Sequence, residues 1–400
     1  MKNGWSHTEL NSLCWEITDG SHFSPKSSEE EQYPYITVRD IQGDTIDFQG
    51  CKFIDTEAYS NLVKNGCQPN KGDILFSKDG TVGKVALVDS QRDFVVLSSL
   101  AIIRPHLDII DSNYLKYALM NPAFLSMAIA QKTGVAIRRI ILKNLKKIEV
   151  SLPNSLTEQK RIVAKLDQAF EAIDQARANV ERNLQNAKDL FQSQLDQNFS
   201  QQGDGWIEKE LIEICDLFVD SAHRTPKYQD EGYPALRPRD VVNGTLNLSS
   251  ANKVSQDEFE IQTKRHVPKP GDIVYSRELS YGWSAILPES PKVCLSQGMC
   301  LFRPSEDVNR NFLVYILNGP IGRSQAKNVA VGAAHPHLNL GDIKSYRIPV
   351  SSITKQKSVV EQLDELSEQT KSLENSYRKK MNDLDELKKS ILQKAFKGEL

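Results

Sequence analysis

The strongest constraint on the fold is an internal duplication, because residues of the first half return in the same order in the second half. The offset between matched residues shrinks only from 201 to 197 along the 400-residue chain, so few insertions or deletions separate the copies. A chain this long exceeds one ordinary hydrophobic core, and each copy is long enough to form a complete domain. The matched pairs include Trp5 and Trp206, Cys14 and Cys215, His22 and His223, Arg39 and Arg239, Gly72 and Gly271, and Asp167 and Asp364.

Composition excludes several classes of protein. Hydrophobic residues make up 39% of the chain and charged residues 26%, which is typical of a globular protein. No stretch is long and apolar enough to span a membrane, and the N-terminus lacks a signal-peptide core, so we expect a cytoplasmic protein. The six cysteines show no C-x-x-C spacing, which favours buried free thiols over disulfides or a zinc site. The net charge of −2 argues against indiscriminate coating of nucleic acid but permits a local basic face.

Each copy begins with a strand-rich part, which predicts an α+β fold. Residues 36–38 and 46–48 flank the turn sequence 42–44, which indicates a hairpin. Further strands are expected over 74–76, 82–88 and 95–103, and a helix over 113–120 with Asn113 as its cap.

A long helix is expected after each globular part. From Thr157 to about Phe199 there is no Gly or Pro, and apolar residues recur at alternating steps of four and three, the seam of a coiled coil. A similar stripe runs from Val359 to Ile391. Helices of roughly forty residues span roughly 60 Å. We expect the two helices to pair within the chain as an antiparallel coiled coil; separate projection, or pairing with other molecules, is the alternative.

Signatures of enzyme chemistry are missing from the sequence. It contains neither a G-x-x-x-x-G-K-[ST] phosphate loop nor a G-x-G-x-x-G motif after a strand. Asn121-Pro122-Ala123-Phe124 is superficially similar to a methyltransferase tetrad, but the second copy has Gly319-Pro320-Ile321 there, which indicates a proline at a helix end. His335-Pro336-His337 offers two metal ligands, but no third lies nearby and the first copy has Ala136-Ile137-Arg138 there. We therefore favour a polar or DNA-facing loop over a metal site.

The segment between Gln131 and Ile148 is basic. It carries six positive charges and no acid: Lys132, Arg138, Arg139, Lys143, Lys146 and Lys147. Such a segment can neutralise the phosphates of a duplex, and its arginines can form forked hydrogen bonds to guanine. A solvated strand or helix edge is the alternative. Because the scaffold positions repeat while this loop diverges in the second copy, the sequence predicts two similar domains that recognise two different sequences.

Other candidate DNA contacts lie in loops at equivalent positions of the two copies. Lys78 and Arg277 follow the shared Gly-Asp strand, and Arg39 matches Arg239. Pairing of each of the latter two with the aspartate that follows it is an equally open interpretation. The candidate DNA-binding residues are Arg39, Lys78, Lys84, Arg138, Arg139, Lys143, Arg237, Arg239, Arg277, His335, His337 and Lys344.

With these features the sequence resembles the specificity subunits of type I restriction-modification systems. The resemblance is carried by the blocks from Leu152 to Asp167 and from Ile348 to Asp364, and by the tail from Ser390 to Leu400. It covers the whole chain and implies two tandem target-recognition domains, each followed by a long helix. The expected boundaries are 1–153 and 203–350 for the domains, and 154–202 and 351–400 for the helices.

The resemblance implies recognition of a bipartite, asymmetric site in double-stranded DNA, with the paired helices as a ruler between the half-sites. It also implies two methyltransferase (modification) subunits that bind S-adenosylmethionine, and restriction (motor-nuclease) subunits that use ATP and magnesium. No catalytic residue, metal or cofactor is expected in this chain. Candidate contacts to the partner subunits are Gln159, Arg161, Gln356, Lys357, Gln393 and Phe396. The alternative is a structural coiled-coil adaptor with protein-binding globular domains; a stand-alone methyltransferase or nuclease is disfavoured by the missing motifs.

Overall fold

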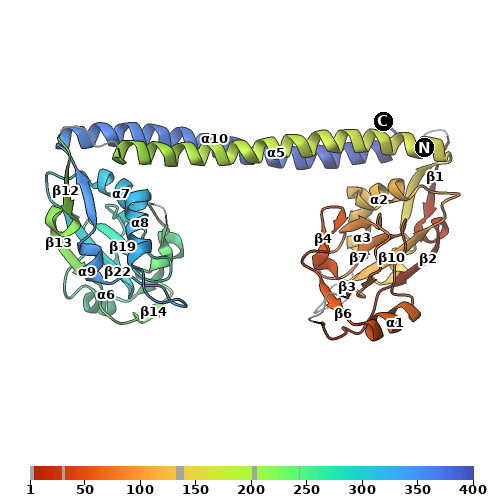
Figure 1. Cartoon of the computed structure of the whole chain (residues 1–400), viewed down its shortest axis with the longest axis horizontal. Helices are drawn as coiled ribbons and strands as arrows, with labels where there is room; N and C mark the ends of the chain where they lie inside the picture. The colour runs from red at the N-terminus through yellow and green to blue at the C-terminus, as the bar shows by residue number, and fades with distance from the viewer. Residues whose placement is uncertain (1–3, 29–31, 132–138, 201–204, 243) are drawn as a thin grey trace. The chain divides into compact units, whose positions relative to one another are not determined.

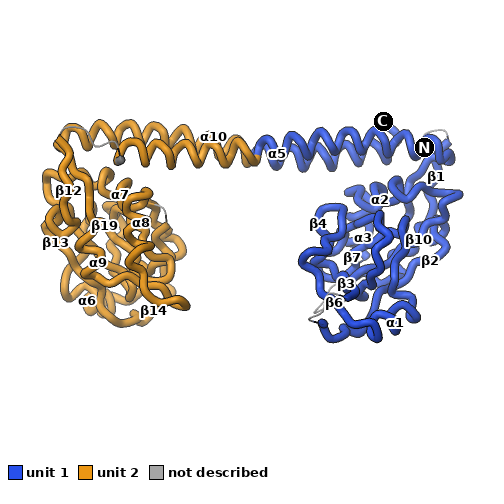
Figure 2. Tube along the Cα trace, viewed as in Figure 1, with its two compact units in different colours: residues 1–180, 379–400 blue, residues 181–378 orange. Residues whose placement is uncertain are grey.

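The computed structural model describes residues 4–28, 32–131, 139–200, 205–242 and 244–400 (Figure 1). The chain divides into two compact units, residues 1–180 with 379–400, and residues 181–378 (Figure 2). Each unit contains one globular part and a piece of both long helices, α5 (Leu156–Ser200) and α10 (Ile353–Phe396).

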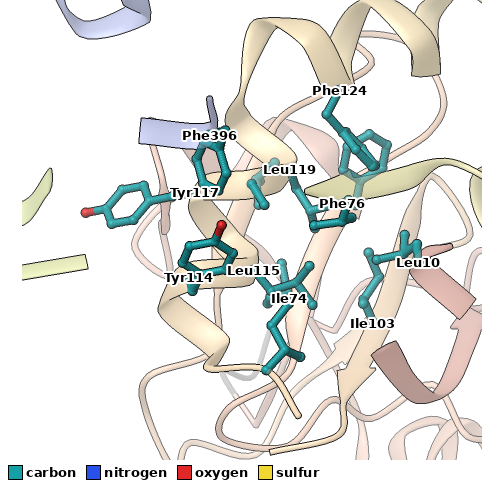
Figure 3. Close-up of a cluster of buried hydrophobic side chains, with 14 of the residues drawn as sticks. Leu10, Ile74, Phe76, Ile103, Tyr114, Leu115, Tyr117, Leu119, Phe124 and Phe396 are labelled. Atoms are coloured by element: carbon teal, nitrogen blue, oxygen red, sulfur yellow. The ribbon is translucent and has the colours of Figure 1, made fainter. Parts of the chain in front are cut away.

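The first unit is built around a four-stranded antiparallel sheet. Its strands, in spatial order, are β2 (Cys14–Asp19), β10 (Leu100–Pro105), β7 (Ile74–Ser77) and β8 (Val85–Leu87). Every residue of β7 and β10 is buried, because apolar side chains cover both faces of the sheet. Ile74, Phe76 and Ile103 belong to one cluster (Figure 3), whereas the alternating residues Leu75 and Ile102 belong to another.

Smaller elements surround this sheet. The short strands are β1 (Trp5–Glu9) with β11 (Glu149–Pro153), β4 (Ile41–Gln42) with β5 (Thr45–Ile46), and the three-stranded set β6 (Lys52–Ile54), β3 (Tyr33–Ile36) and β9 (Val95–Val96). The helices are α1 (Thr56–Lys64), α2 (Ser112–Met120), α3 (Pro122–Ala130) and α4 (Leu142–Leu145). α2 begins one residue before the predicted helix because Asp111, and not Asn113, caps it: the Asp111 carboxylate accepts from the Tyr114 N–H at 3.1 Å.

Several of the predicted strands differ from the observed ones. The predicted hairpin exists, but its strands are β4 and β5, which lie closer to the turn at Gly43 than expected, and Gly43 adopts a φ of 61°. The stretch 95–103 is not one strand. The Leu100 N–H donates to the Leu97 carbonyl at 2.9 Å, and this turn sends β9 and β10 into different sheets.

The second unit repeats the topology. Its central sheet is β13 (Cys215–Asp220), β22 (Met299–Pro304), β19 (Ile273–Ser276) and β20 (Ser284–Ile286). The short strands are β12 (Ile207–Glu210) with β23 (Arg347–Val350), β16 (Val241–Val242) with β17 (Thr245–Leu246), and the set β14 (Tyr228–Gln229), β18 (Asn252–Val254), β15 (Tyr233–Leu236) and β21 (Cys294–Leu295). The helices are α6 (Gln256–Gln262), α7 (Arg310–Asn318), α8 (Pro320–Val329) and α9 (Leu340–Lys344). The duplication seen in the sequence is thus a duplication of structure.

Within the first unit, the two long helices run antiparallel. Arg177 of α5 forms an ion pair with Asp385 of α10, and Asp174 lies 3.5 Å from Lys388, so residue numbers fall on one helix as they rise on the other. The predicted seam residues Ile162, Leu166 and Ile173 are buried, as expected. Val163 and Phe170, which lie off the seam, are buried too, because this end of α5 also packs on the globular part. The long helices therefore contribute to the domain core as well as to a coiled coil.

The cysteines are free, and all but the half-buried Cys215 are buried, which agrees with the expected buried thiols. Burial raises the pKa of Cys14 and of Cys215 to about 12, so both thiols stay protonated and unreactive at neutral pH. Over the described residues, no helix has the length and apolar character needed to cross a membrane.

Candidate nucleic-acid interface

Several candidate residues of the first unit gather where β2 and β7 end. Both strands pair antiparallel with β10, so their C-terminal ends lie at the same end of the sheet. The N–H of Ile140 donates to the carbonyl of Lys78 at 3.0 Å, which brings the end of the basic segment to this end of the sheet. The N–H of Leu97 donates to the carbonyl of Ile36 at 3.0 Å, which adds the turn after β3. We call residues 20–28, 37–40, 77–84, 97–99 and 139–140 the first loop face.

Equivalent hydrogen bonds in the second unit define a second loop face, which comprises residues 221–227, 237–240, 276–283, 296–298 and 331–338. The N–H of Leu338 donates to the carbonyl of Arg277 at 2.8 Å, as the N–H of Ile140 does to that of Lys78. His337 is therefore the structural counterpart of Arg139. The sequence comparison that set His337 opposite Arg138 is wrong by one residue.

Lys78 and Arg277, predicted as DNA contacts, are buried instead. Lys78 is only 5% exposed, and its ammonium lies 3.1 Å from the carboxylate of Asp19. Arg277 is 9% exposed and forms an ion pair with Asp220, the counterpart of Asp19. In both units the positive side chain is neutralised by an aspartate inside the protein. Lys78 and Arg277 therefore stabilise the loops and are not available to bind a ligand.

Lys84 and Arg237 also bond inside their own units. The ammonium of Lys84 donates to the carbonyls of Val38 and Ile41, at 3.1 and 2.6 Å, and so holds the short helix η2 (Val38–Asp40) against β8. The guanidinium of Arg237 forms a two-pronged ion pair with Asp240, at 2.9 and 3.0 Å, in the equivalent short helix η4 (Pro238–Asp240). Both residues position the neighbouring loop rather than face solvent.

Arg39 and Arg239 are exposed at equivalent positions on η2 and η4. Neither arginine forms an ion pair with any described residue. Arg39 therefore does not pair with Asp40, nor Arg239 with Asp240. The carboxylate of Asp40 instead accepts from the N–H and hydroxyl of Thr37, at 2.7 and 2.8 Å. These two guanidiniums keep their hydrogen-bonding capacity for a ligand.

The basic segment is only partly described. Lys132 and Arg138 lie outside the described residues. Arg139 is exposed on the first loop face, next to the Ile140 bond. Lys143, on α4, is exposed in a shallow depression that it shares with Glu9 and Asn11, so it belongs to a separate patch.

The His335 to His337 stretch forms a closed loop on the second loop face. His337 and Val331 exchange two backbone hydrogen bonds, at 2.9 and 3.0 Å, and the carbonyl of Pro336 accepts from Leu279 at 2.9 Å. His335 is exposed and His337 half-buried. Lys344, on α9, is half-buried with its ammonium 5.5 Å from the centre of the Phe218 ring. No set of three His, Cys, Asp or Glu side chains with the geometry of a metal site occurs among the residues that the structure describes.

Sequence reasoning gave no role to His22 and His223, although both belong to the repeat. The imidazole of His22 lies 3.5 Å from Asp19, and that of His223 lies 3.1 Å from Asp220. Both rings are about two-thirds exposed on their loop faces, with side-chain exposures of 65% and 64%. Their recurrence at the same offset as Trp5 and Trp206 was the signal available in the sequence.

Two of the predicted partner contacts, Gln159 and Gln356, are fully buried at 0% exposure. The Gln159 amide accepts from the N–H of Asp111 at 2.9 Å and donates to the carbonyl of Ile109 at 3.0 Å. Gln356 makes the equivalent bonds to Asn309 and Asp307, at 2.8 and 3.0 Å. Both amides therefore join a long helix to the start of an earlier helix of the same globular part, α2 in the first unit and α7 in the second. Neither amide has an exposed atom to offer a partner protein.

The other predicted partner contacts differ in exposure. Arg161 is bonded to Glu158 and to the carbonyl of Leu400, at 2.7 and 2.9 Å. Lys357 and Gln393 are exposed. Phe396 is buried in the core of the first unit, where its ring packs edge-on against Tyr114 with 5.1 Å between ring centres (Figure 3).

A second contact between each long helix and its globular part was not predicted from the sequence. The hydroxyl of Tyr117 on α2 donates to Asp167 of α5 at 2.5 Å, and that of Tyr315 on α7 donates to Asp364 of α10 at 2.6 Å. Burial raises the pKa of both tyrosines, and the neighbouring carboxylate raises it further, so the hydroxyls remain donors. The repeated Leu-Asp block of the long helices thus serves the attachment of each globular part.

Comparison with known proteins agrees with this architecture. The EcoBI specificity subunit of a type I restriction enzyme from Escherichia coli is 24% identical over 431 residues, which cover 100% of this chain and 87% of that protein. The MjaVIII specificity subunit from Methanocaldococcus jannaschii is 22% identical over 395 residues, which cover 93% and 87%.

Solved structures share the fold. A chain from a study of complex assembly and conformational transition of the type I R-M system superimposes with a TM-score of 0.77 at 18% identity, covering 100% of this chain and 99% of that one. The HsdS subunit from Thermoanaerobacter tengcongensis gives a TM-score of 0.57 at 18% identity, with 100% and 98% covered. The type I restriction modification DNA specificity domain matches twice, over residues 2–182 and 203–382. The chain therefore belongs to the type I restriction-modification DNA specificity family and is a DNA-sequence recognition subunit.

Proposed function

We propose that residues 1–153 and 203–350 each recognise one half of a bipartite, asymmetric site in double-stranded DNA. The contrast between the two loop faces supports this proposal. The same scaffold presents Arg139 in the first unit and His337 in the second. An arginine side chain suits the two acceptors of guanine, whereas an imidazole offers one donor or acceptor at each nitrogen, so equivalent positions favour different bases.

The partners are two methyltransferase (modification) subunits, which bring S-adenosylmethionine, and restriction (motor-nuclease) subunits, which use ATP and magnesium. The chain itself contributes no catalytic group and works in the cytoplasm. The modification subunits dock largely on the helical segments 154–202 and 351–400. Leu190, Leu373 and Leu387 support this docking, since these leucines are 52%, 45% and 46% exposed on otherwise polar helix surfaces.

The helical segments also set the spacer between the two half-sites. Each globular part is fastened to its helix by a buried glutamine and by a tyrosine–aspartate hydrogen bond, Gln159 with Tyr117 in the first unit and Gln356 with Tyr315 in the second. Such joints let the length of the helices determine where each recognition domain meets the duplex.

The test is selection from random duplex DNA by the complex of this chain with its modification subunits. We expect a motif of two specific parts separated by unspecified bases, and no motif from the modification subunits alone. Exchanging residues 203–350 for the same domain of a relative is expected to change one part of the motif only. A single continuous motif, or none, would overturn the proposal.

A further inference from the structure

Three exposed basic residues are the same in both copies at equivalent positions of the two loop faces. They are His22 and His223, Lys26 and Lys227, and Arg39 and Arg239. Most other exposed positions around them differ between the copies. Phe23, which is 85% exposed, corresponds to Arg224, and Gly80 corresponds to the exposed Leu279.

The histidine and arginine of each set are held by matching contacts. His22 and His223 each lie beside the aspartate whose second contact is the buried Lys78 or Arg277. Asp40 of η2 accepts a hydrogen bond from the N–H of Thr37 at 2.7 Å, and Asp240 of η4 accepts one from the N–H of Arg237 at 3.0 Å. The arginines next to these aspartates, Arg39 and Arg239, remain exposed. These histidines and arginines therefore occupy the same positions in both units as well as having the same chemistry.

These two segments converge on one loop. In the first unit, Leu97 donates to the carbonyl of Ile36, just before η2, and Ser98 donates to the carbonyl of Ser21, just before His22, at 3.0 and 2.8 Å. In the second unit, Ser296 donates to the carbonyl of Leu236, just before η4, at 2.8 Å. Ser221, two residues before His223, donates to the carbonyl of Met299 at the end of the loop at 3.1 Å. A histidine and an arginine thus flank the same short loop on each loop face.

Two half-sites of one duplex differ in their bases but share the same sugar-phosphate backbone. Side chains that contact phosphate carry no sequence information, whereas contacts to base edges do. Basic side chains that are identical and equally placed in two domains that read different sequences match the part of the ligand that does not change, its phosphates. Neighbouring side chains that differ between the copies match the bases, which differ between the half-sites.

We propose that His22, Lys26 and Arg39, with His223, Lys227 and Arg239, form two equivalent phosphate-binding sets that grip the backbone of each half-site independently of sequence. Base readout falls to the divergent positions beside them, Arg139 in the first unit and His337 in the second. This inference rests on the proposed function, since it assumes that the loop faces meet DNA.

The experiment measures Kd against salt concentration for the complex with its modification subunits, on cognate duplex and on a duplex lacking the motif. For the pair Arg39→Gln and Arg239→Gln, we expect affinity for both duplexes to fall by the same factor. The slope of log Kd against log salt should decrease by about 2, roughly one for each lost phosphate contact. The selected motif should stay unchanged. Arg139→Gln should instead weaken cognate binding alone and relax one half of the motif.

Matched controls are Lys71→Gln and Arg310→Gln. Lys71 precedes β7 and Arg310 lies against Gly271 before β19, so both exposed cations sit at the end of a central strand opposite its loop face. Both variants should keep the wild-type salt slope. A changed motif in the Arg39 and Arg239 variant, or an unchanged slope, overturns the phosphate assignment. Failure of the wild-type complex to select any bipartite motif would instead overturn the proposed function, so the two failures are distinct.

Discussion

At the residue scale, the structure separates positive charges that look alike in the sequence. Lys78 and Arg277 follow a strand in a loop, as a DNA contact would, yet each is neutralised by an aspartate at the end of another strand of the central sheet, β2 or β13. The partner of Lys78 lies 59 positions earlier in the chain, so only folding brings it near. For Arg39 the sequence left pairing with the neighbouring Asp40 open, and the structure shows that this aspartate bonds to Thr37 instead. Charge can be predicted from sequence, whereas its pairing depends on tertiary contacts.

Because Lys78 stabilises the fold, we predict that its substitution affects stability and not DNA recognition. Lys78→Met leaves the carboxylate of Asp19 without its buried partner, and we expect the free energy of unfolding to fall by about 3 kcal/mol. The selected DNA motif should remain that of the wild type. Chemical denaturation and motif selection measure the two effects. Lys71→Met, at the exposed end of the same strand, should change neither; a changed motif with wild-type stability in the Lys78 variant would restore Lys78 as a base contact.

At the element scale, periodic patterns were predictable and short irregular segments were not. The apolar seam identified the long helices because its period is set by helix geometry alone. The turn at Gly43 was also predictable, since few residues adopt its backbone conformation. In contrast, the break between β9 and β10 has no glycine or proline to mark it. The two loop faces could not be assembled from sequence because hydrogen bonds between distant segments define them.

The joint between helix and globular part yields an element-scale prediction. Gln159→Ala removes the buried partner of the Asp111 N–H and of two carbonyls, those of Ile109 and Pro153. Each unpaired buried group costs about 1 to 3 kcal/mol, so we expect unfolding of the first unit at a clearly lower denaturant concentration. Gln356→Ala should do the same to the second unit. Lys160→Ala, at an exposed neighbouring position on the same helix, serves as control, and equal midpoints for Gln159→Ala and Lys160→Ala would show that the amide is not a joint.

At the scale of the whole molecule, duplication followed by divergence lets one chain serve the asymmetric site that we propose. Both copies keep the central sheet, the glutamine and tyrosine joints and the exposed basic residues of the loop faces. They differ at Arg139 and His337, the exposed and the half-buried side chain to which we assign base readout. On the proposed function, shared attachment with different loops lets each half of the motif change separately, and the proposed role of the helices leaves the spacing to a different part of the chain.

The spacing yields the last prediction. Inserting 21 residues, about three heptads, after Val180 and the same number after Arg378 preserves the apolar seam and adds about 32 Å of helix. This length is close to one turn of duplex DNA, about 34 Å, so each recognition domain keeps nearly its original orientation to the grooves. We expect both halves of the selected motif to be unchanged and the spacer between them to grow by about nine base pairs. Modification subunits should still bind, as size measurement of the complex can verify. An unchanged spacer in such an intact complex would mean that the length of the helices does not set the distance between half-sites, and that the joints at Gln159 and Gln356 serve stability alone.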